Sequence, residues 1–291
     1  MNSKNRKIWG FIFVLPQLIG LILFSLIPLF NTISISFTEW DGISPVKKFV
    51  GLNNYIAEFN NPDFIKGLRN TLYYMILHVP FVIILGLLVA LAVKNIYGKT
   101  VYRVIYFMPV VTGSVSVGVI WTWLLNGEFG LINQFLSMIG IKGPQWLTDP
   151  RWVLPAIAIV AVWWGLGYNM VIFLASLQNV PKTYYEAAEI DGANGYYKFL
   201  HITLPMISPT TFFVTVMTII NSFQVFDLAM VMTEGGPAKA SYTFVYHIYE
   251  SAFIKFRMGN ATASAMVLFV IILIVTLFQM RMSERWVNYD I

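Results

Sequence analysis

The stretch TYYEAAEIDGANGYYKFLHITLPMISP, from Thr183 to Pro209, is a polar, helix-prone island between two long apolar segments. Thr183 and Glu186 have the spacing of a capping box, in which the two side chains satisfy free N–H groups at a helix start. We therefore expect a short helix to begin near Tyr184. Asp191-Gly192 supplies a turn and a glycine suited to the left-handed conformation, so this helix should end by Gly192.

The second half of the island predicts another short helix, from Asn194 through Phe199 towards Leu204-Pro205, where the proline fits the first turn of the next apolar segment. The whole island thus predicts a helix, a tight turn and a helix. From these residues alone, a structural connector or a helix resting on a lipid surface fits as well as an element that docks a partner.

The composition on either side of the island indicates an integral membrane protein. Of the 291 residues, 57% are hydrophobic and only 11% are charged. The apolar runs suit helices that cross about 30 Å of hydrocarbon with roughly 20 residues each, whereas barrel strands would be shorter and alternate in polarity. We expect an all-α membrane protein with six transmembrane helices, at about residues 8–30, 70–93, 101–125, 152–177, 205–231 and 261–280.

Basic residues without acidic neighbours predict the orientation of these spans. They are Lys4, Arg6, Lys7, Lys94, Lys99 and Arg103. Both termini and the island, which connects spans four and five, are therefore expected in the cytoplasm, with residues 39–69 and 233–259 outside. We expect a single transmembrane domain, 1–291, with its core at about 70–281.

Several kinds of chemistry are disfavoured by the residue inventory. The net charge of +5 resides mostly in residues that flank apolar helices, so we expect no nucleic-acid partner. The chain has no cysteine, and its histidines, His78, His201 and His247, are scattered, so no metal site is predicted.

Polar residues in the fifth span predict an aqueous path or a helix contact. Thr211, Thr215, Thr218 and Ser222 recur at steps of four, three and four, which places them on one helical face. Such hydroxyls often only aid helix packing or bond their own backbone. The neighbouring polar groups Asn221, Gln224 and Asp227 are costly to bury in lipid, although Asp227 is close enough to the end of the span to reach the interface.

In the fourth span, Trp163, Trp164, Tyr168 and Asn169 combine aromatic faces with hydrogen-bonding groups around Gly165 and Gly167. Sugars need both kinds of contact, because their C–H faces pack on rings while their hydroxyls seek directional partners. An aromatic belt at the membrane interface is the alternative, most of all for Trp163.

The island closely resembles the EAA signature of the membrane permeases of bacterial ABC importers. The matching residues are Glu186-Ala187-Ala188, Asp191-Gly192-Ala193, Phe199, Ile202, Leu204-Pro205 and Pro209. Four further segments resemble the carbohydrate-uptake permeases of the MalF, LacF and UgpA type: FTEWDG (37–42), FVGLNNY (49–55), FG-x-IN (129–133) and TEGGP (233–237).

The resemblance implies one permease half of an ATP-driven importer of a sugar or oligosaccharide, working by alternating access in a bacterial cell membrane. Its implied partners are a second, MalG-like permease, two cytosolic ATPase subunits and an extracellular solute-binding protein. The chain has no G-x-x-x-x-G-K-[ST] phosphate loop, so we expect it to bind no cofactor and to catalyse no reaction, with ATP and Mg²⁺ held by the ATPases. A secondary transporter or channel working without an ATPase is the alternative that a six-span bundle alone would allow.

The resemblance also implies roles for particular residues. Glu186, Ala187, Ala188, Asp191 and Gly192, within a coupling loop at 181–204, would dock on the ATPase. The expected substrate path comprises Gly165, Tyr168, Asn169, Thr218, Asn221, Ser222 and Gln224. Of these, Gly165, Tyr168, Thr218 and Ser222 match positions that line the MalF sugar site, whereas Val225 stands where that site has an amide. Gly235, Gly236 and Pro237 would form a loop on the binding-protein side, or simply a tight turn.

Overall fold

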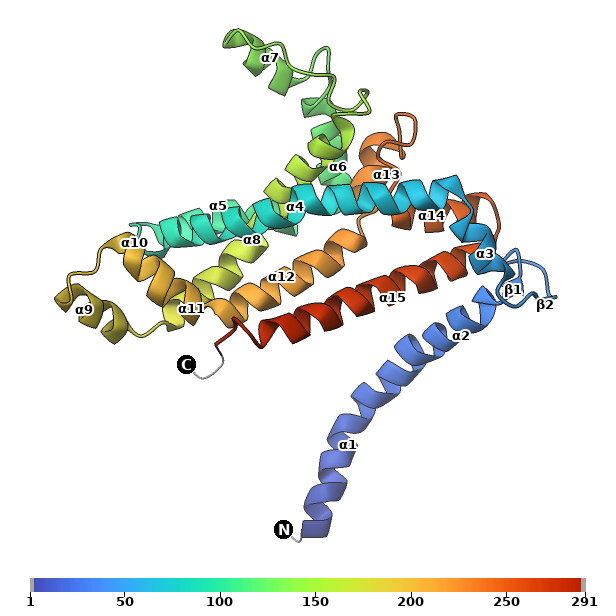
Figure 1. Ribbon diagram of the computed structural model, residues 1–291, viewed down its shortest axis with the longest axis horizontal. Coiled ribbons are helices and arrows are strands. Elements are labelled where there is room, and N and C mark those ends of the chain that lie inside the picture. Colours follow the sequence, from blue (N-terminus) through green and yellow to red (C-terminus); the bar gives the residue numbers. More distant parts are fainter. Residues whose placement is uncertain (1–2, 289–291) are drawn as a thin grey trace. The chain divides into compact units, whose positions relative to one another are not determined.

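The computed structural model describes residues 3–288, with side chains from residue 11 onward, and is built almost entirely of helices (Figure 1). The two termini and the basic side chains of Lys4, Arg6 and Lys7 lie outside the described part. The described chain forms two compact units, one of residues up to 64 with 247–269, the other of residues 65–246 with those from 270 onward.

Within the described residues, four helical segments are long and apolar enough to cross a membrane: Phe11–Ser36, α4 (Pro62–Lys94), α8 (Val153–Asn179) and α15 (Met258–Ser283). Two further pairs qualify only when joined across a bend. They are α5 (Lys99–Val111) with α6 (Ser114–Leu124), bent by 97°, and the Gly195–Met206 segment with α12 (Ser208–Phe223), bent by 67°. If each bent pair is one span, the described chain contains the six spans predicted from its hydropathy.

In the first unit, the N-terminal span consists of α1 (Ser3–Leu21), a π-helical turn η1 (Ile22–Leu26) and α2 (Ile27–Ser36). The segment after it, predicted only as a loop, is ordered by a short antiparallel ribbon, β1 (Thr38–Glu39) with β2 (Lys48–Phe49), followed by helix α3 (Asn53–Phe59). The amide of Asn54 donates to the carbonyls of Ser36 and Thr38, both at 2.9 Å, and so ties α3 to the ribbon.

A buried polar cluster joins α3 to the C-terminal segments of the same unit. Glu58 is only 4% exposed, and one of its carboxylate oxygens lies 2.6 Å from Nε2 of the fully buried His247. Asn260 and Ser264 also donate to this carboxylate, each at 3.1 Å. Burial favours the neutral acid, but the contacts with His247, Asn260 and Ser264 outweigh it, so the pKa of Glu58 lies below its ordinary value.

Helix α8 is the centre of the second unit. Half of its most apolar 18-residue stretch is buried, compared with 22% of the corresponding stretch of α4. Its N-terminal half packs with α6 and with α13 (Asp227–Thr233), and its C-terminal half packs with α4 and with residues around Ile207 and Val214. At Gly167 the α5 backbone approaches so closely that a Cβ would lie 2.8 Å from the carbonyl carbon of Tyr106 and 2.9 Å from the Cα of Phe107.

The remaining elements of the described chain are short. They are α7 (Leu131–Met138), α9 (Lys182–Ile190), α10 (Gly195–Lys198), η2 (Phe199–Thr203), α11 (Leu204–Met206), α14 (Phe244–Tyr249) and η3 (Glu250–Ile254).

The third and fifth predicted spans are wrong as continuous helices. The third breaks at Thr112 and Gly113, whose extended backbones, with ψ of 132° and 143°, cannot continue the helical hydrogen bonding of α5 into α6. In the fifth, Pro205 lies in α11 before the 67° bend, so the long helix begins at Ser208. That helix ends at Phe223, and α13 begins as a separate helix at Asp227.

Candidate functional site

The predicted helix–turn–helix connects α8 to α12 along the chain and lies at the left of Figure 1. Its first helix, α9, begins at Lys182, and no side chain caps it. The predicted capping box is therefore wrong, since Thr183 already lies in the first turn. The extended backbone of Pro181, with φ of −60° and ψ of 134°, sets the helix start instead, because proline fixes φ and cannot donate a hydrogen bond.

The turn itself forms as expected. Gly192 has a φ of +76°, a conformation that favours glycine, and the N–H of Ala193 donates to the carbonyl of Ala188 at 2.8 Å. The side chain of Asn194 then caps α10 by accepting from the N–H of Tyr197 at 2.9 Å. This second helix continues through η2 to Thr203, as the sequence predicts for the island.

Contacts between the two halves brace this loop, while its outer face is free. Lys198 pairs with Glu189 at 2.7 Å, and the hydroxyls of Tyr185 and Thr203 lie 3.0 Å apart. Outward, Ile190 is 87% exposed and Tyr196 73% exposed. Glu186, Ala187, Asp191 and Gly192 are exposed as well, and Ala188 is half-buried. A braced element with large exposed apolar side chains is suited to docking on a partner.

A cavity of about 170 Å³ lies in the second unit beside the broken helices. The structure brings five of the seven predicted substrate-path residues to its wall: Gly165, Tyr168, Asn169, Thr218 and Asn221. His78, Val82, Val110 and Trp164 complete the lining.

The other two residues do not line this cavity. Ser222 is 1% exposed, and its hydroxyl donates to the carbonyl of Thr218 at 2.7 Å. Gln224 is exposed just after α12 ends. Thr211 and Thr215 also bond carbonyls one turn back, so much of the hydroxyl stripe serves its own helix.

His78 also lines the cavity, although the sequence pattern did not assign it to the substrate path. Its Nδ1 lies 2.9 Å from the Ser222 hydroxyl, and its ring stacks on Tyr74 at 5.2 Å with an angle of 14°. These contacts hold the imidazole at the cavity. The one signal in the sequence was a histidine within an apolar span, where a polar group normally faces a partner or water.

Two helix breaks adjoin the cavity, and side-chain hydrogen bonds hold both. The indole of Trp164 donates to the Thr112 carbonyl at the end of α5, at 3.1 Å. Ser114, at the start of α6, donates to Asp227, at the start of α13, at 2.8 Å. Broken helices around a polar cavity are a common way to form a solute site within a membrane.

The Gly235-Gly236-Pro237 turn belongs to a loop that is fixed to the N-terminal part of α4. Gly235 has a φ of +77°, and the carbonyl of Gly236 accepts from the Ser241 hydroxyl at 2.6 Å. Lys66 donates to the carbonyl of Ala238 at 2.7 Å, and Asn70 to those of Lys239 and Tyr242, both at 2.9 Å.

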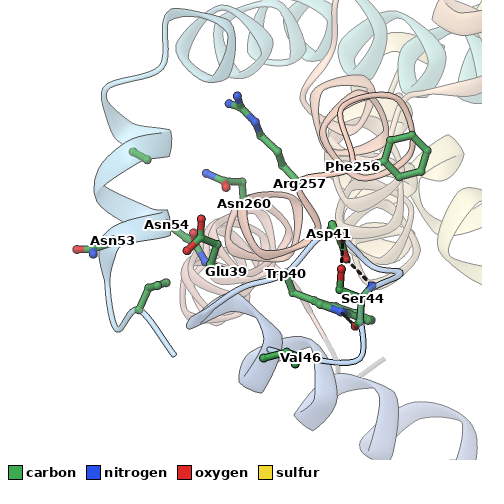
Figure 2. Close-up of a pocket in the computed structure, with 12 residues that line it drawn as sticks. Glu39, Trp40, Asp41, Ser44, Val46, Asn53, Asn54, Phe256, Arg257 and Asn260 are labelled. Carbon is green, nitrogen blue, oxygen red and sulfur yellow. Dashed lines mark hydrogen bonds between the residues drawn. The ribbon is translucent and has the colours of Figure 1, made fainter. Parts of the chain in front are cut away.

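The first unit carries a larger polar groove of about 670 Å³ (Figure 2). In Figure 2 the side chains of Glu39, Asn54, Asn260 and Arg257 gather beside α3. Asp41 instead accepts from Ser44 and from two backbone N–H groups, which lowers its pKa to about 2 and fixes the loop. Arg257 is exposed and has no carboxylate partner among the residues the structure describes. Within the same described range, no group of three His, Asp or Glu residues is placed to hold a metal ion.

The apolar helices, the breaks around a polar cavity and the exposed helix–turn–helix define a multi-pass membrane transport subunit. The chain belongs to the family of binding-protein-dependent transport system inner membrane components, whose model matches residues 56–288.

Similar proteins cover nearly the whole chain. The sn-glycerol-3-phosphate transport system permease UgpA of Agrobacterium fabrum is 33% identical over 98% of this chain and 97% of its own length. The arabinooligosaccharide transport system permease AraP of Bacillus subtilis is 34% identical over 96% of this chain and 90% of its own. The fold matches a chain of a bacterial ABC transporter that imports the acidic polysaccharide alginate, with a TM-score of 0.85, 24% identity and 98% of both chains covered.

Proposed function

We propose that this chain is one permease half of an ATP-driven importer that takes up a sugar or oligosaccharide by alternating access. The observation that carries the proposal is the braced, outward-facing α9–α10 loop, which we infer to be the coupling loop to a separate ATPase. The names of the relatives support a carbohydrate or a small polyol derivative as the cargo. The absence of a phosphate loop in the sequence supports an ATP and Mg²⁺ site on partner subunits.

The geometry of α4 supports the proposed orientation. Its C-terminal residues Leu91 and Lys94 line a cavity together with Tyr185 of α9, so this end lies beside the coupling loop. Its N-terminal part is bonded through Lys66 and Asn70 to the loop after Gly235-Gly236-Pro237. A helix of 33 residues measures about 50 Å, which exceeds the hydrocarbon thickness of about 30 Å. With the coupling loop in the cytoplasm, the glycine turn lies outside, on the binding-protein side.

In the proposed cycle, docking of the ATPase on Glu186 to Gly192 moves spans four and five as rigid bodies. The cavity lined by Tyr168, Asn169 and Thr218 then opens as the solute path. Its present volume of about 170 Å³ is below the roughly 300 Å³ of small ligand pockets, which supports a closed state. The outer groove at Arg257 offers a further polar contact for the external binding protein, the third partner in this proposal beside the second permease and the ATPases.

Uptake into vesicles tests the proposal. The chain, co-expressed with its partner subunits, is reconstituted with binding protein outside and ATP either enclosed or omitted, and a panel of labelled sugars is supplied. We expect accumulation of one or a few sugars that requires enclosed ATP. Uptake without ATP, or failure of any ATPase to co-purify with the chain, would contradict the proposal and favour a transporter that works without an ATPase.

A further inference from the structure

A second cavity in the larger unit has a strongly basic lining. It has a volume of about 520 Å³ and lies between the ends of α4 and α8, the start of α5, and α9 and α10. Its charged residues are Lys94, Lys99, Lys182, Lys198 and Glu189, which give four positive charges and one negative charge, a formal net charge of +3. A cavity with this excess of one sign favours an anion.

The single acidic residue of the lining, Glu189, already forms an ion pair. Glu189 lies 2.7 Å from Lys198, so that pair neutralises itself. Lys94, Lys99 and Lys182 have no carboxylate partner among the residues the structure describes. The ammonium group of Lys94 lies 5.3 Å from the centre of the Tyr185 ring, a contact that leaves its positive charge uncompensated. Three ammonium groups from three separate elements therefore face one cavity without a counter-charge.

Outside the cavity lining, an arginine one helical turn from Lys99 adds a further positive charge to α5. Arg103 lies four residues after Lys99 and therefore on the same face of α5. Two of its guanidinium nitrogens, Nε and Nη2, are buried without a hydrogen-bond partner in the described chain. Buried unpaired guanidinium groups are costly, and an anion nearby reduces that cost.

We propose that the Lys94–Lys99–Lys182 cavity is a binding site for a phosphate group, supplied by the headgroup of an anionic lipid. Its place at the ends of membrane helices puts it at the headgroup level, where basic pockets between helices bind such lipids. A phosphate held there contacts α4, α5 and α9 at once. It would fix the proposed coupling loop to α4 and α5, in the second and third spans. Only this consequence for coupling rests on the proposed function.

Lipid retention provides the test, with a matched control. The full-length chain with its co-purified subunits is placed in nanodiscs of phosphatidylcholine with 30% phosphatidylglycerol, taken as a probe composition of about one anionic lipid in three. Lipids retained after gentle detergent extraction are counted by native mass spectrometry. The variant Lys94→Gln/Lys99→Gln/Lys182→Gln is compared with Lys47→Gln/Lys48→Gln/Lys142→Gln, which loses the same charge elsewhere.

We expect retention of phosphatidylglycerol to fall by roughly 100-fold in the first variant, since the three lysines contribute about 1 kcal/mol each near the headgroups. Retention should be unchanged in the control. Competition by inorganic phosphate, but not by chloride at equal ionic strength, would show that the phosphate itself is recognised. Equal losses in both variants would indicate general charge attraction and overturn the site. So would undiminished retention in the first variant, or loss of the lipid whenever the ATPase is bound. Because the readout requires no transport, it can fail or succeed independently of the proposed import function.

Discussion

Substituting Gly167 by alanine tests whether close packing of α5 on α8 holds the cavity wall in place. The added Cβ would collide with the carbonyl oxygen of Tyr106 and lie 2.8 and 2.9 Å from two further α5 backbone atoms. No flexible side chain can move aside to relieve this contact. At Gly165, two residues earlier on the same helix, the nearest atom is a Val82 methyl carbon at 3.6 Å, an ordinary contact.

Both substitutions bring the same gain in helix propensity, about 1 kcal/mol, so their difference isolates the clash. Inserting a methyl group into a packed backbone contact costs about 1–3 kcal/mol. Gly167→Ala should therefore unfold several degrees below Gly165→Ala, followed by tryptophan fluorescence during heating of the purified complex in nanodiscs. Equal midpoints for the two variants would refute the proposed close packing of α5 on α8.

Four further predictions concern single side chains. Glu186→Lys should abolish ATP-dependent uptake and weaken ATPase co-purification, whereas the same charge change at exposed Glu128 should do neither; normal uptake in Glu186→Lys would remove this residue from the coupling site. His78→Ala should raise the KM for sugar uptake by about tenfold, the order expected for losing one polar contact, and His78→Asn should raise it less; an unchanged KM in both variants would count against a place in the path. The pKa of Glu58 is lowered in the fold, so its stabilising contribution is present above its ordinary pKa of 4.5 and is lost as the pH falls through the lower folded value. The stability difference between wild type and Glu58→Gln should therefore shrink below pH 4.5, as measured by unfolding across pH 3–7; a difference that stays constant would contradict this. Arg257→Glu should slow association of the binding protein several-fold in a salt-dependent way. An unaltered association rate would exclude the outer groove as the contact of the binding protein.

The predicted spans followed from hydropathy, because some 20 consecutive apolar residues leave few alternatives in a membrane. The turn at Asp191-Gly192 was equally predictable from the sequence, since a positive φ at the end of a helix favours glycine. The start of α9 was missed because the spacing of Thr183 and Glu186 is common, and the preceding Pro181 governs the local backbone.

The helix breaks and the cavity wall were not predictable in the same way. The break at Thr112-Gly113 depends on an indole from residue 164, and the other is held by a bond between residues 114 and 227. His78 reaches the predicted path through Ser222, which lies 144 positions further along the chain. Periodicity describes contacts within one helix and carries no information about such distant pairs.

The hydrogen bond from Trp164 to Thr112 limits how the solute cavity can change its size. The indole forms part of the cavity wall and also satisfies a carbonyl that the end of α5 leaves open. Swinging the ring aside would strand that oxygen in a poorly hydrated interior, at a cost of about 1–3 kcal/mol. The cavity therefore enlarges more easily when α5 and α8 move together. The aromatic wall then keeps its shape, and the cavity widens on the opposite side, towards Thr218 and Asn221.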